Sequence, residues 1–389
     1  MNPNVSISRS PIGGRGLFCD REIRCGDILV AVPASGIISA ERLQDDPRYG
    51  HIIAPLRRSG LDERGVMALG LVLSSLGSDN MLKGYLKCLP TVYELSKEHP
   101  LLSRDLSPST AVGVSVHKMR CHILNQLRGV IRAHKALGFN DELSNARHSY
   151  LEELWCWAHA IVLSRSGIKA YSNDASRSDD SESDIFIIPF IDFCNHADIP
   201  TAYVTESKDG SMQLVAQRDM APGDEVTISY WPEDEPLTCE QSLFSFGFCS
   251  NRMRFAIPGI DVQRVDDDPR KAVQRLLFLD RRKGKDDFIY LDSLDLAAEY
   301  FAIAEMTERD FESLVAGVVK NGKVSIANSE ILKPAFDRGR LRLLSHLTSW
   351  RNDISNNRSH AQVPSEYIRM LCAALDDSIA TLTVSNRKH

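Results

Sequence analysis

The sequence has 389 residues, of which 43% are hydrophobic and 25% are charged, and its formal net charge is −6. This length exceeds what one ordinary core fills, so it predicts a soluble globular protein of about two to three domains. The acidic balance argues against a general nucleic-acid-binding protein, because such proteins usually carry a basic face. The first 20 residues contain no apolar run. We therefore expect neither a secretory signal nor a membrane anchor, and an intracellular location whose compartment stays open.

The nine cysteines stand singly along the chain. No Cys-x-x-Cys pair occurs, whereas cysteines at that spacing are typical of zinc sites and redox motifs. The simpler interpretation is a set of reduced and mostly buried thiols, as intracellular proteins usually have.

Two related segments predict strands at the two ends of one β domain. Gly13 to Pro33, GGRGLFCDREIRCGDILVAVP, contains a glycine turn, a short strand, a Cys-Gly-Asp turn and a second strand that ends at Pro33. Arg21 to Asp27 has the sequence REIRCGD, and 197 residues later Arg218 to Asp224 has the sequence RDMAPGD. One such match is too little for a repeat architecture. We interpret it as the same strand-turn-strand geometry used twice.

Helical patterns occupy most of residues 40–149, with clear segments at 64–76 and 115–137, and they predict a helical insertion. A further helix is expected over 150–165, with an apolar stripe at spacings of three and four. The stripe consists of Leu151, Leu154, Trp155, Ala158 and Val162. Arg165 closes the stripe, and an inward guanidinium usually needs an anion.

The acidic segment SNDASRSDDSESD, residues 172–184, predicts a solvated loop. From about residue 254 the pattern is again helical, apart from a possible short strand near Phe288. These residues predict a second domain.

The segment IPFIDFCNHADIP, Ile188 to Pro200, places Cys194, Asn195 and His196 together after an apolar run. In an extended chain residues two apart lie roughly 6.6 Å apart, whereas a nucleophile and its base need contact at about 3 Å. The pair therefore argues against a cysteine hydrolase. Asp192, His196 and the isolated cysteines lack a recurrent ligand spacing, so we predict no metal site. A capped loop with a hydrogen-bonded histidine is the plainer alternative.

Two further motifs follow. PGDEVTISYW, Pro222 to Trp231, predicts a strand with Val226, Ile228 and Tyr230 on one face, which leaves the tyrosine hydroxyl at the inward-facing end. EQSLFSFGFCSN predicts a helix-like turn that Gly247 breaks between two aromatic residues. Taken singly, each is more often structural than functional.

The order of these motifs resembles the SET-domain protein methyltransferases: Gly-x-Gly-Leu, a helix ending in arginine, Asp-x-x-Asn-His, Gly-Asp-Glu-Val-x-Ile-x-Tyr, and Phe-Gly-Phe. Within that family the chain is similar to the Rubisco large-subunit methyltransferase branch, which includes enzymes acting on lysines of non-histone proteins and a group acting on actin histidine. The resemblance covers most of the chain. It implies an α+β fold: a SET domain of small curled β-sheets with a pseudoknot over residues 1–253, a helical insertion at about 40–149, and an all-α substrate-binding domain over 254–389.

The resemblance also implies a cofactor, S-adenosylmethionine, and the residues that bind it. Glycines at 13, 14 and 16 are expected to let the backbone approach the cofactor, because a Cβ there would collide with it. Arg165 is expected to bind the cofactor's carboxylate, and Phe248 to pack on the adenine. The full set of predicted cofactor-binding residues is Gly13, Gly14, Arg15, Arg165, Asp192, Asn195, His196, Phe246 and Phe248.

Tyr230 is the predicted catalytic residue. By the resemblance it lies beside Asn195 and His196, and its hydroxyl orients the acceptor amine and the methyl group, so that most of the rate gain is positioning. An apolar channel favours the neutral amine.

The predicted substrate-binding residues are Tyr203, Ile191 and Ile228. Ile191 stands where the histidine-methylating group has a large aromatic residue, and Gly167 leaves the adjoining position small, so both favour lysine. The chain departs from its relatives at two positions. Gly13 stands where relatives often have glutamate, and Phe246 stands where they often have tyrosine. The second difference bears on the number of methyl groups added. Exposed charges at 281–283 are expected to hold the protein substrate.

We therefore predict a monomeric protein-lysine N-methyltransferase that acts on a non-histone protein, without nucleic-acid or membrane partners. Two alternatives stay open: a protein-histidine methyltransferase of the same fold, and a catalytically idle SET-like scaffold that binds proteins. Fold analogy does not name the substrate protein or the methylated site.

Overall fold

A computed structural model describes residues 4–77, 82–102, 111–139, 142–168, 185–231, 239–248, 294–304, 306–321, 332–356 and 365–386, together with residues 255, 257, 270, 326 and 329. The chain forms two compact units, Met1–Ser103 with Lys118–Pro236, and Arg104–His117 with Leu237–His389. The first unit ends at Pro236, and the predicted domain boundary at residue 253 stays a prediction. The acidic segment 172–184, Phe288 and the charges at 281–283 lie outside the described residues.

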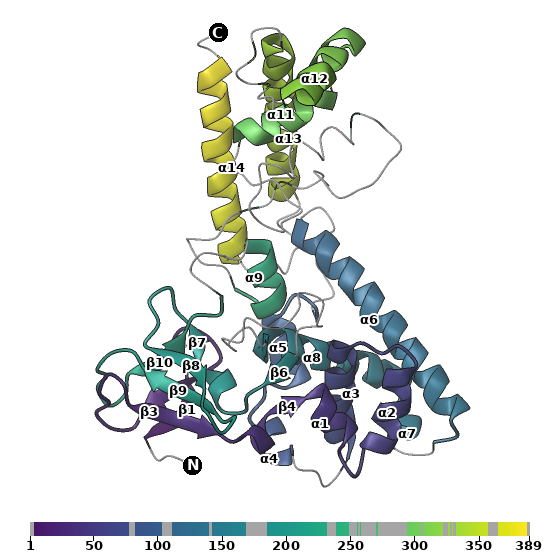
Figure 1. Ribbon diagram of the computed structural model, residues 1–389, viewed down its shortest axis with the longest axis vertical. Coiled ribbons are helices and arrows are strands. Elements are labelled where there is room, and N and C mark those ends of the chain that lie inside the picture. The colour runs from purple at the N-terminus through teal and green to yellow at the C-terminus, as the bar shows by residue number, and fades with distance from the viewer. Residues whose placement is uncertain are drawn as a thin grey trace. The chain divides into compact units, whose positions relative to one another are not determined.

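The first unit contains three small sheets (Figure 1). One has the order β1-β2-β10-β7, with β1 (Val5–Arg9), β2 (Arg15–Cys19), β10 (Glu225–Ile228) and β7 (Asn195–His196). A second has the order β3-β9-β8, with β3 (Ile28–Val32), β9 (Met212–Ala216) and β8 (Ala202–Glu206). The third has the order β4-β6-β5, with β4 (Ile38–Ser39), β6 (Ile185–Ile187) and β5 (Ser166–Ile168). The strand pairs are antiparallel except β10 with β7, which is parallel.

The first two sheets are built alike. Strands β1, β2 and β3 match β8, β9 and β10 at the offset of 197 residues that separates Arg21 from Arg218. The β1–β2 and β8–β9 hairpins close with equivalent backbone bonds, from Ser10 N to Gly14 O at 3.1 Å and from Ser207 N to Ser211 O at 2.8 Å. The correspondence therefore extends well beyond the matched sequence.

The two Gly-Asp turns pair with each other. Ile23 and Met220, which are equivalent positions, form an antiparallel bridge with two hydrogen bonds of 2.9 Å. Gly26 and Gly223 have φ values of +90° and +88°, in the left-handed region that glycine adopts at low cost. The predicted strand-turn-strand geometry is confirmed at both ends of the β domain.

The helical insertion packs beside the sheets (Figure 1). Its elements are α1 (Ala40–Gln44), α2 (Gly50–Arg58), α3 (Glu63–Leu76), α4 (Lys83–Leu86), α5 (Val92–Glu98), α6 (Ala111–Ala136), α7 (Glu142–Asn145) and α8 (His148–Arg165). The Asp62 carboxylate caps α3 by accepting the Gly65 N–H at 2.7 Å, as an N-cap residue does. The predicted helices at 64–76, 115–137 and 150–165 are confirmed.

Helix α8 is more enclosed than the single apolar stripe predicted. Every residue from Leu154 to Val162 is buried, because the helix runs through the core of the insertion against α3 and α5. The Trp155 indole is fully buried and donates to the Ile123 carbonyl at 2.8 Å. The helix therefore holds Arg165, its last residue, on a rigid support.

The second unit is helical in the residues described, as predicted. Its helices are α9 (Cys239–Phe246), α11 (Leu294–Ala304), α12 (Glu308–Asn321), α13 (Lys333–Asn356) and α14 (Ser365–Asn386). Gly339 allows α13 to approach α11 closely, since a Cβ there would lie 2.6 Å from the Ala302 nitrogen. Within the described ranges, no helix combines the length and the apolar content that crossing a membrane requires.

Candidate active site

The Asp-x-x-Asn-His segment begins in a short turn after β6 and ends in β7. Strand β6 ends at Ile187, and Phe190 then adopts φ +79°, a conformation rare for a bulky residue. A short 3-10 turn, η2 (Ile191–Phe193), leads into β7. Because β7 pairs in parallel with β10, Asn195 lies opposite Thr227 and His196 opposite Ile228.

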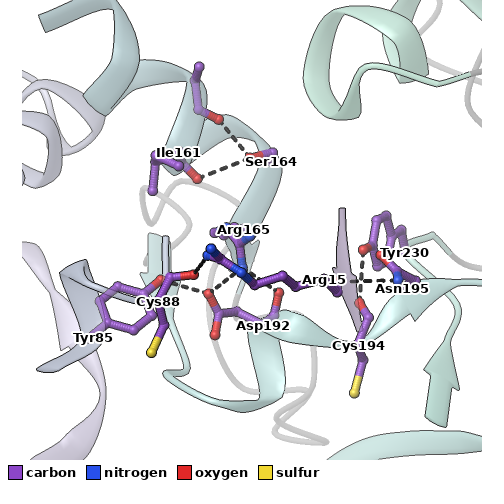
Figure 2. A network of polar contacts seen from close by, with 11 residues as sticks. Arg15, Tyr85, Cys88, Ile161, Ser164, Arg165, Asp192, Cys194, Asn195 and Tyr230 are labelled. Carbon is purple, nitrogen blue, oxygen red and sulfur yellow. Dashed lines mark hydrogen bonds and ion pairs between the residues drawn. The ribbon is translucent and has the colours of Figure 1, made fainter. Parts of the chain in front are cut away.

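Tyr230 lies two residues beyond β10, which ends at Ile228, so it is not on the strand face that the alternation predicted. Its hydroxyl donates a hydrogen bond of 2.8 Å to the Cys194 carbonyl, and its backbone N–H donates to His196 Nδ1 at 3.3 Å (Figure 2). The His196 ring lies 3.9 Å from the Trp231 ring, centroid to centroid. The predicted placement of Tyr230 beside His196 is confirmed, and its catalytic role stays a prediction.

Burial sets the protonation of this cluster. It raises the pKa of the Tyr230 hydroxyl well above its ordinary value, although nearby Arg165 partly opposes the rise, so the hydroxyl keeps its proton at neutral pH. Burial also raises the pKa of the Cys194 thiol well above its usual range. A thiol so protonated is a poor nucleophile, in agreement with the sequence argument against a cysteine hydrolase. Burial lowers the pKa of His196, so its imidazole is neutral at neutral pH.

Asn195 is fixed by two acceptors. Its amide nitrogen donates to Glu225 Oε1 at 2.6 Å and to the Arg15 carbonyl at 3.3 Å, while the other carboxylate oxygen of Glu225 accepts from the Ser10 hydroxyl at 2.8 Å. Since both partners of the amide are acceptors, the nitrogen must face them. Among the described residues, no donor reaches the Asn195 amide oxygen. That oxygen is therefore available to a ligand.

The three glycines of the N-terminal motif have different reasons to be glycine. A Cβ at Gly13 or Gly14 would meet no atom within 4 Å, and Gly14 has φ +58°. A Cβ at Gly16 would overlap Glu225 Oε1 and lie 3.1 Å from the Asn195 amide nitrogen. Gly16 thus has a reason to be glycine within the chain itself, because it leaves room for the Glu225–Asn195 bond; the predicted close approach of the cofactor to these glycines stays a prediction.

Arg165 points inward and forms an ion pair with the carboxylate of Asp192. Its Nη1 donates to Asp192 Oδ2 and to the Asp192 carbonyl, each at 3.0 Å, and its guanidinium lies 4.5 Å above the Phe193 ring. The Asp192 side chain is 1% exposed and that of Arg165 is 15% exposed. The Tyr85 hydroxyl donates to the same Asp192 oxygen at 2.6 Å.

The remaining predicted residues are distributed over both units. Ile191 is buried and Ile228 partly buried, whereas Tyr203 is 44% exposed on β8, in the other sheet. Phe246 and Phe248 lie in the second unit, with ring centroids 6.1 Å apart. In the described part of the chain, no group of three or more His, Cys, Asp or Glu residues could hold a metal ion.

Four partners in this network were not predicted: Ser10, Tyr85, Cys88 and Glu225. Glu225 lies inside the quoted GDEV motif, and Ser10 immediately precedes the glycine turn, so both had a local signal. Tyr85 and Cys88 had none, because they reach Asp192 and Arg15 from the helical insertion.

The family model of the SET domain matches residues 14–231, more than half of the chain. The chain belongs to the SET-domain family. Its fold is similar to that of Rubisco LSMT bound to AdoMet, with a TM-score of 0.63 and 15% identity over 99% of this chain and 88% of that one. The SET domain of LSMT bound to lysine and AdoHcy gives a TM-score of 0.61 and 16% identity over the same shares. No curated protein matches the chain.

The predicted cofactor, S-adenosylmethionine, is the methyl donor of SET domains, and the residues of this SET domain fit its chemistry. The hairpin at Gly13 and Gly14 has open space beside its backbone. The Asn195 amide oxygen, and the Nε and Nη2 groups of Arg165, have no partner among the described residues. Together these groups offer an acceptor and a charged fork of donors, which suit the amino-acid end of the cofactor.

Proposed function

We propose that this SET-domain methyltransferase is a protein-lysine N-methyltransferase that uses S-adenosylmethionine and acts on a non-histone protein. The observation that carries the proposal is the position of Tyr230. Its protonated hydroxyl is held on the Cys194 carbonyl, beside the β7–β10 pair that presents Asn195. An intracellular location and a monomeric state are part of the proposal.

The cofactor, when bound, supplies an electrophilic methyl group. The chain's own residues then have three tasks: Gly13 to Arg15 contact the cofactor through their main chain, Asn195 and Arg165 hold its amino-acid end, and Tyr230 orients the acceptor nitrogen. Because the Tyr230 hydroxyl keeps its proton, it directs the acceptor's lone pair by position and not by removing a proton. Preorganised groups of this kind accelerate transfer through orientation.

The preference for lysine rests on the size and polarity of the acceptor side. Ile191 is aliphatic and 2% exposed, and Gly167 adds no side chain, although a Cβ there would sit in ordinary contact with the Phe186 ring at 3.4 Å. An apolar lining disfavours the charged ammonium and so favours the neutral amine that transfer requires.

The test is transfer of labelled methyl from S-adenosylmethionine to proteins of a cell extract, followed by acid hydrolysis and identification of the labelled amino acid. The proposal expects labelled methyl-lysine with the wild-type protein and little label with Tyr230→Phe. Mass spectrometry of the labelled protein then identifies the substrate. Labelled methyl-histidine would assign the other substrate class, and cofactor binding without any transfer would assign a binding scaffold.

A further inference from the structure

One short segment of the helical insertion contacts two of the predicted cofactor-binding residues. From α4 the Tyr85 hydroxyl donates to Asp192 Oδ2 at 2.6 Å, and just after α4 the Cys88 carbonyl accepts a hydrogen bond from Arg15 Nη1. Figure 2 shows both contacts on the same side of the network. The insertion is thus tied directly to the cofactor side of the SET domain.

The Tyr85 hydroxyl is one of two side-chain donors to the Asp192 carboxylate among the described residues. Asp192 Oδ2 accepts from Tyr85 and from Arg165, while Asp192 Oδ1 is buried and has no hydrogen-bond partner among the described residues. Burial raises the pKa of Asp192, and the bonds from Arg165 and Tyr85 oppose that rise. Burial, together with the negative charge of Asp192, raises the pKa of Tyr85 well above its ordinary value, so Tyr85 remains a donor.

The bonds of Arg165 leave one edge of the guanidinium open. Nη1 donates to two oxygens of Asp192, and one face of the guanidinium lies over the Phe193 ring. Within the described residues no acceptor reaches Nε or Nη2. Because the Arg165 side chain is partly exposed and that of Asp192 is almost wholly buried, Arg165 can contact a ligand. Asp192 and Tyr85 can affect the ligand only through Arg165.

Building on the function proposed above, we propose that Tyr85 is a positioning residue for the cofactor. Through Asp192 it fixes the direction in which Arg165 presents its open edge to the carboxylate of S-adenosylmethionine. A buried hydroxyl-to-carboxylate bond is strong and short, and its loss leaves Asp192 held by Arg165 alone. Asp192 could then turn toward other donors and draw the guanidinium with it.

The experiment compares two ligands by calorimetry: S-adenosylhomocysteine and its decarboxylated analogue, which keeps the adenosine, thioether and amine. Tyr85→Phe should weaken binding of S-adenosylhomocysteine by about tenfold, the scale expected for a lost hydrogen bond to a charged group. Binding of the decarboxylated analogue should change by less than about twofold. Phe keeps the edge contact that Tyr85 makes with Phe193, whose ring centroid is 6.4 Å away.

Tyr93→Phe is the matched control, because Tyr93 is 69% exposed on α5 of the same insertion, and it should leave both affinities unchanged. Arg165→Ala should show the same ligand dependence, and adding Tyr85→Phe to it should cause no further loss. Asp192→Asn, as a second route to the same effect, should again spare the decarboxylated analogue.

Equal weakening of both ligands by Tyr85→Phe would overturn the proposal, since it would indicate a general structural role. Unchanged binding of both ligands would overturn it as well, while the proposed function would stand. If the wild-type protein binds neither ligand, the proposed function fails, and the positioning role fails with it.

Discussion

The two sheets built from β1, β2, β10 and from β8, β9, β3 share one layout, yet only the first holds the candidate site. The difference is β7, a strand of two residues that adds Asn195 and His196 to the free edge of β10. In the second sheet the equivalent strand, β3, pairs with β9 alone among the described strands and carries a register shift between Ile28 and Val30. A shared scaffold thus becomes a site where an added strand brings polar side chains to one edge.

Residues at equivalent positions of the two sheets differ where the first sheet contacts Asn195 of β7. Gly16 corresponds to Gln213, and Glu225 corresponds to Ile28, which is 44% exposed. The first sheet has no side chain at Gly16 and a carboxylate at Glu225, and both features accommodate the Asn195 amide. Beyond the strands, Tyr230 corresponds to Pro33, so the second sheet has no counterpart of the Tyr230 hydroxyl.

The largest predicted effect is a loss of folding stability, and it should be the same for both sheets. Leu17 and Leu214 are equivalent and fully buried, so Leu17→Ala and Leu214→Ala should each lower the free energy of unfolding by about 2–5 kcal/mol, through lost contacts and the cavity left behind. Urea denaturation followed by circular dichroism measures both. A loss at Leu17 alone would mean that the second sheet does not share the scaffold described.

The second largest predicted effect is a loss of turnover, and it should arise from a residue next to the first sheet only. Tyr230→Phe should lower turnover by at least about tenfold, equivalent to about 1.4 kcal/mol in the barrier, with cofactor affinity near that of the wild type, because the hydroxyl acts on the transition state. Calorimetry and a methyl-transfer assay separate the two quantities. Tyr150→Phe, at an exposed position on α8, is the control. Near-normal turnover of Tyr230→Phe would remove the residue from catalysis.

Gly16→Ala should destabilise the protein by about 1–2 kcal/mol, as overpacking does, and should also weaken cofactor binding, because the new methyl group displaces Glu225 from Asn195. Gln213→Ala at the equivalent position should change stability by less than about 0.5 kcal/mol and should not affect the cofactor. Thermal unfolding with and without S-adenosylhomocysteine measures both effects. Equal effects of the two substitutions would contradict the assigned role of Gly16.

The smallest expected effect tests the carboxylate alone. Glu225→Gln keeps the size of the side chain but replaces a charged acceptor of the Asn195 amide by a neutral one, so cofactor affinity should fall by about threefold, in line with weaker hydrogen bonds to neutral groups. Ile28→Gln in the other sheet should leave affinity unchanged. Calorimetric titration with S-adenosylhomocysteine compares the pair. An affinity of Glu225→Gln equal to that of the wild type would show that the charge is dispensable.

The sequence predicted those features that depend on local pattern: the strand-turn-strand pair, the long helices, and the inward Arg165. The order of its motifs pointed to the family that the SET-domain match then established. The sequence did not reveal features that depend on tertiary partners. Tyr85 reaches Asp192 from 107 positions away, and Gly16 is dictated by Glu225. No periodicity within either segment carries that information.

Hydrogen exchange of the two equivalent hairpin loops tests most directly whether the added strand makes the first sheet the cofactor site. Backbone amides from Gly13 to Arg15 and from Gly210 to Met212 would be followed by mass spectrometry with and without saturating S-adenosylhomocysteine. The cofactor should slow exchange at Gly13 to Arg15 and leave Gly210 to Met212 unchanged. Equal protection of both loops, or protection of the second loop alone, would contradict this assignment of the site.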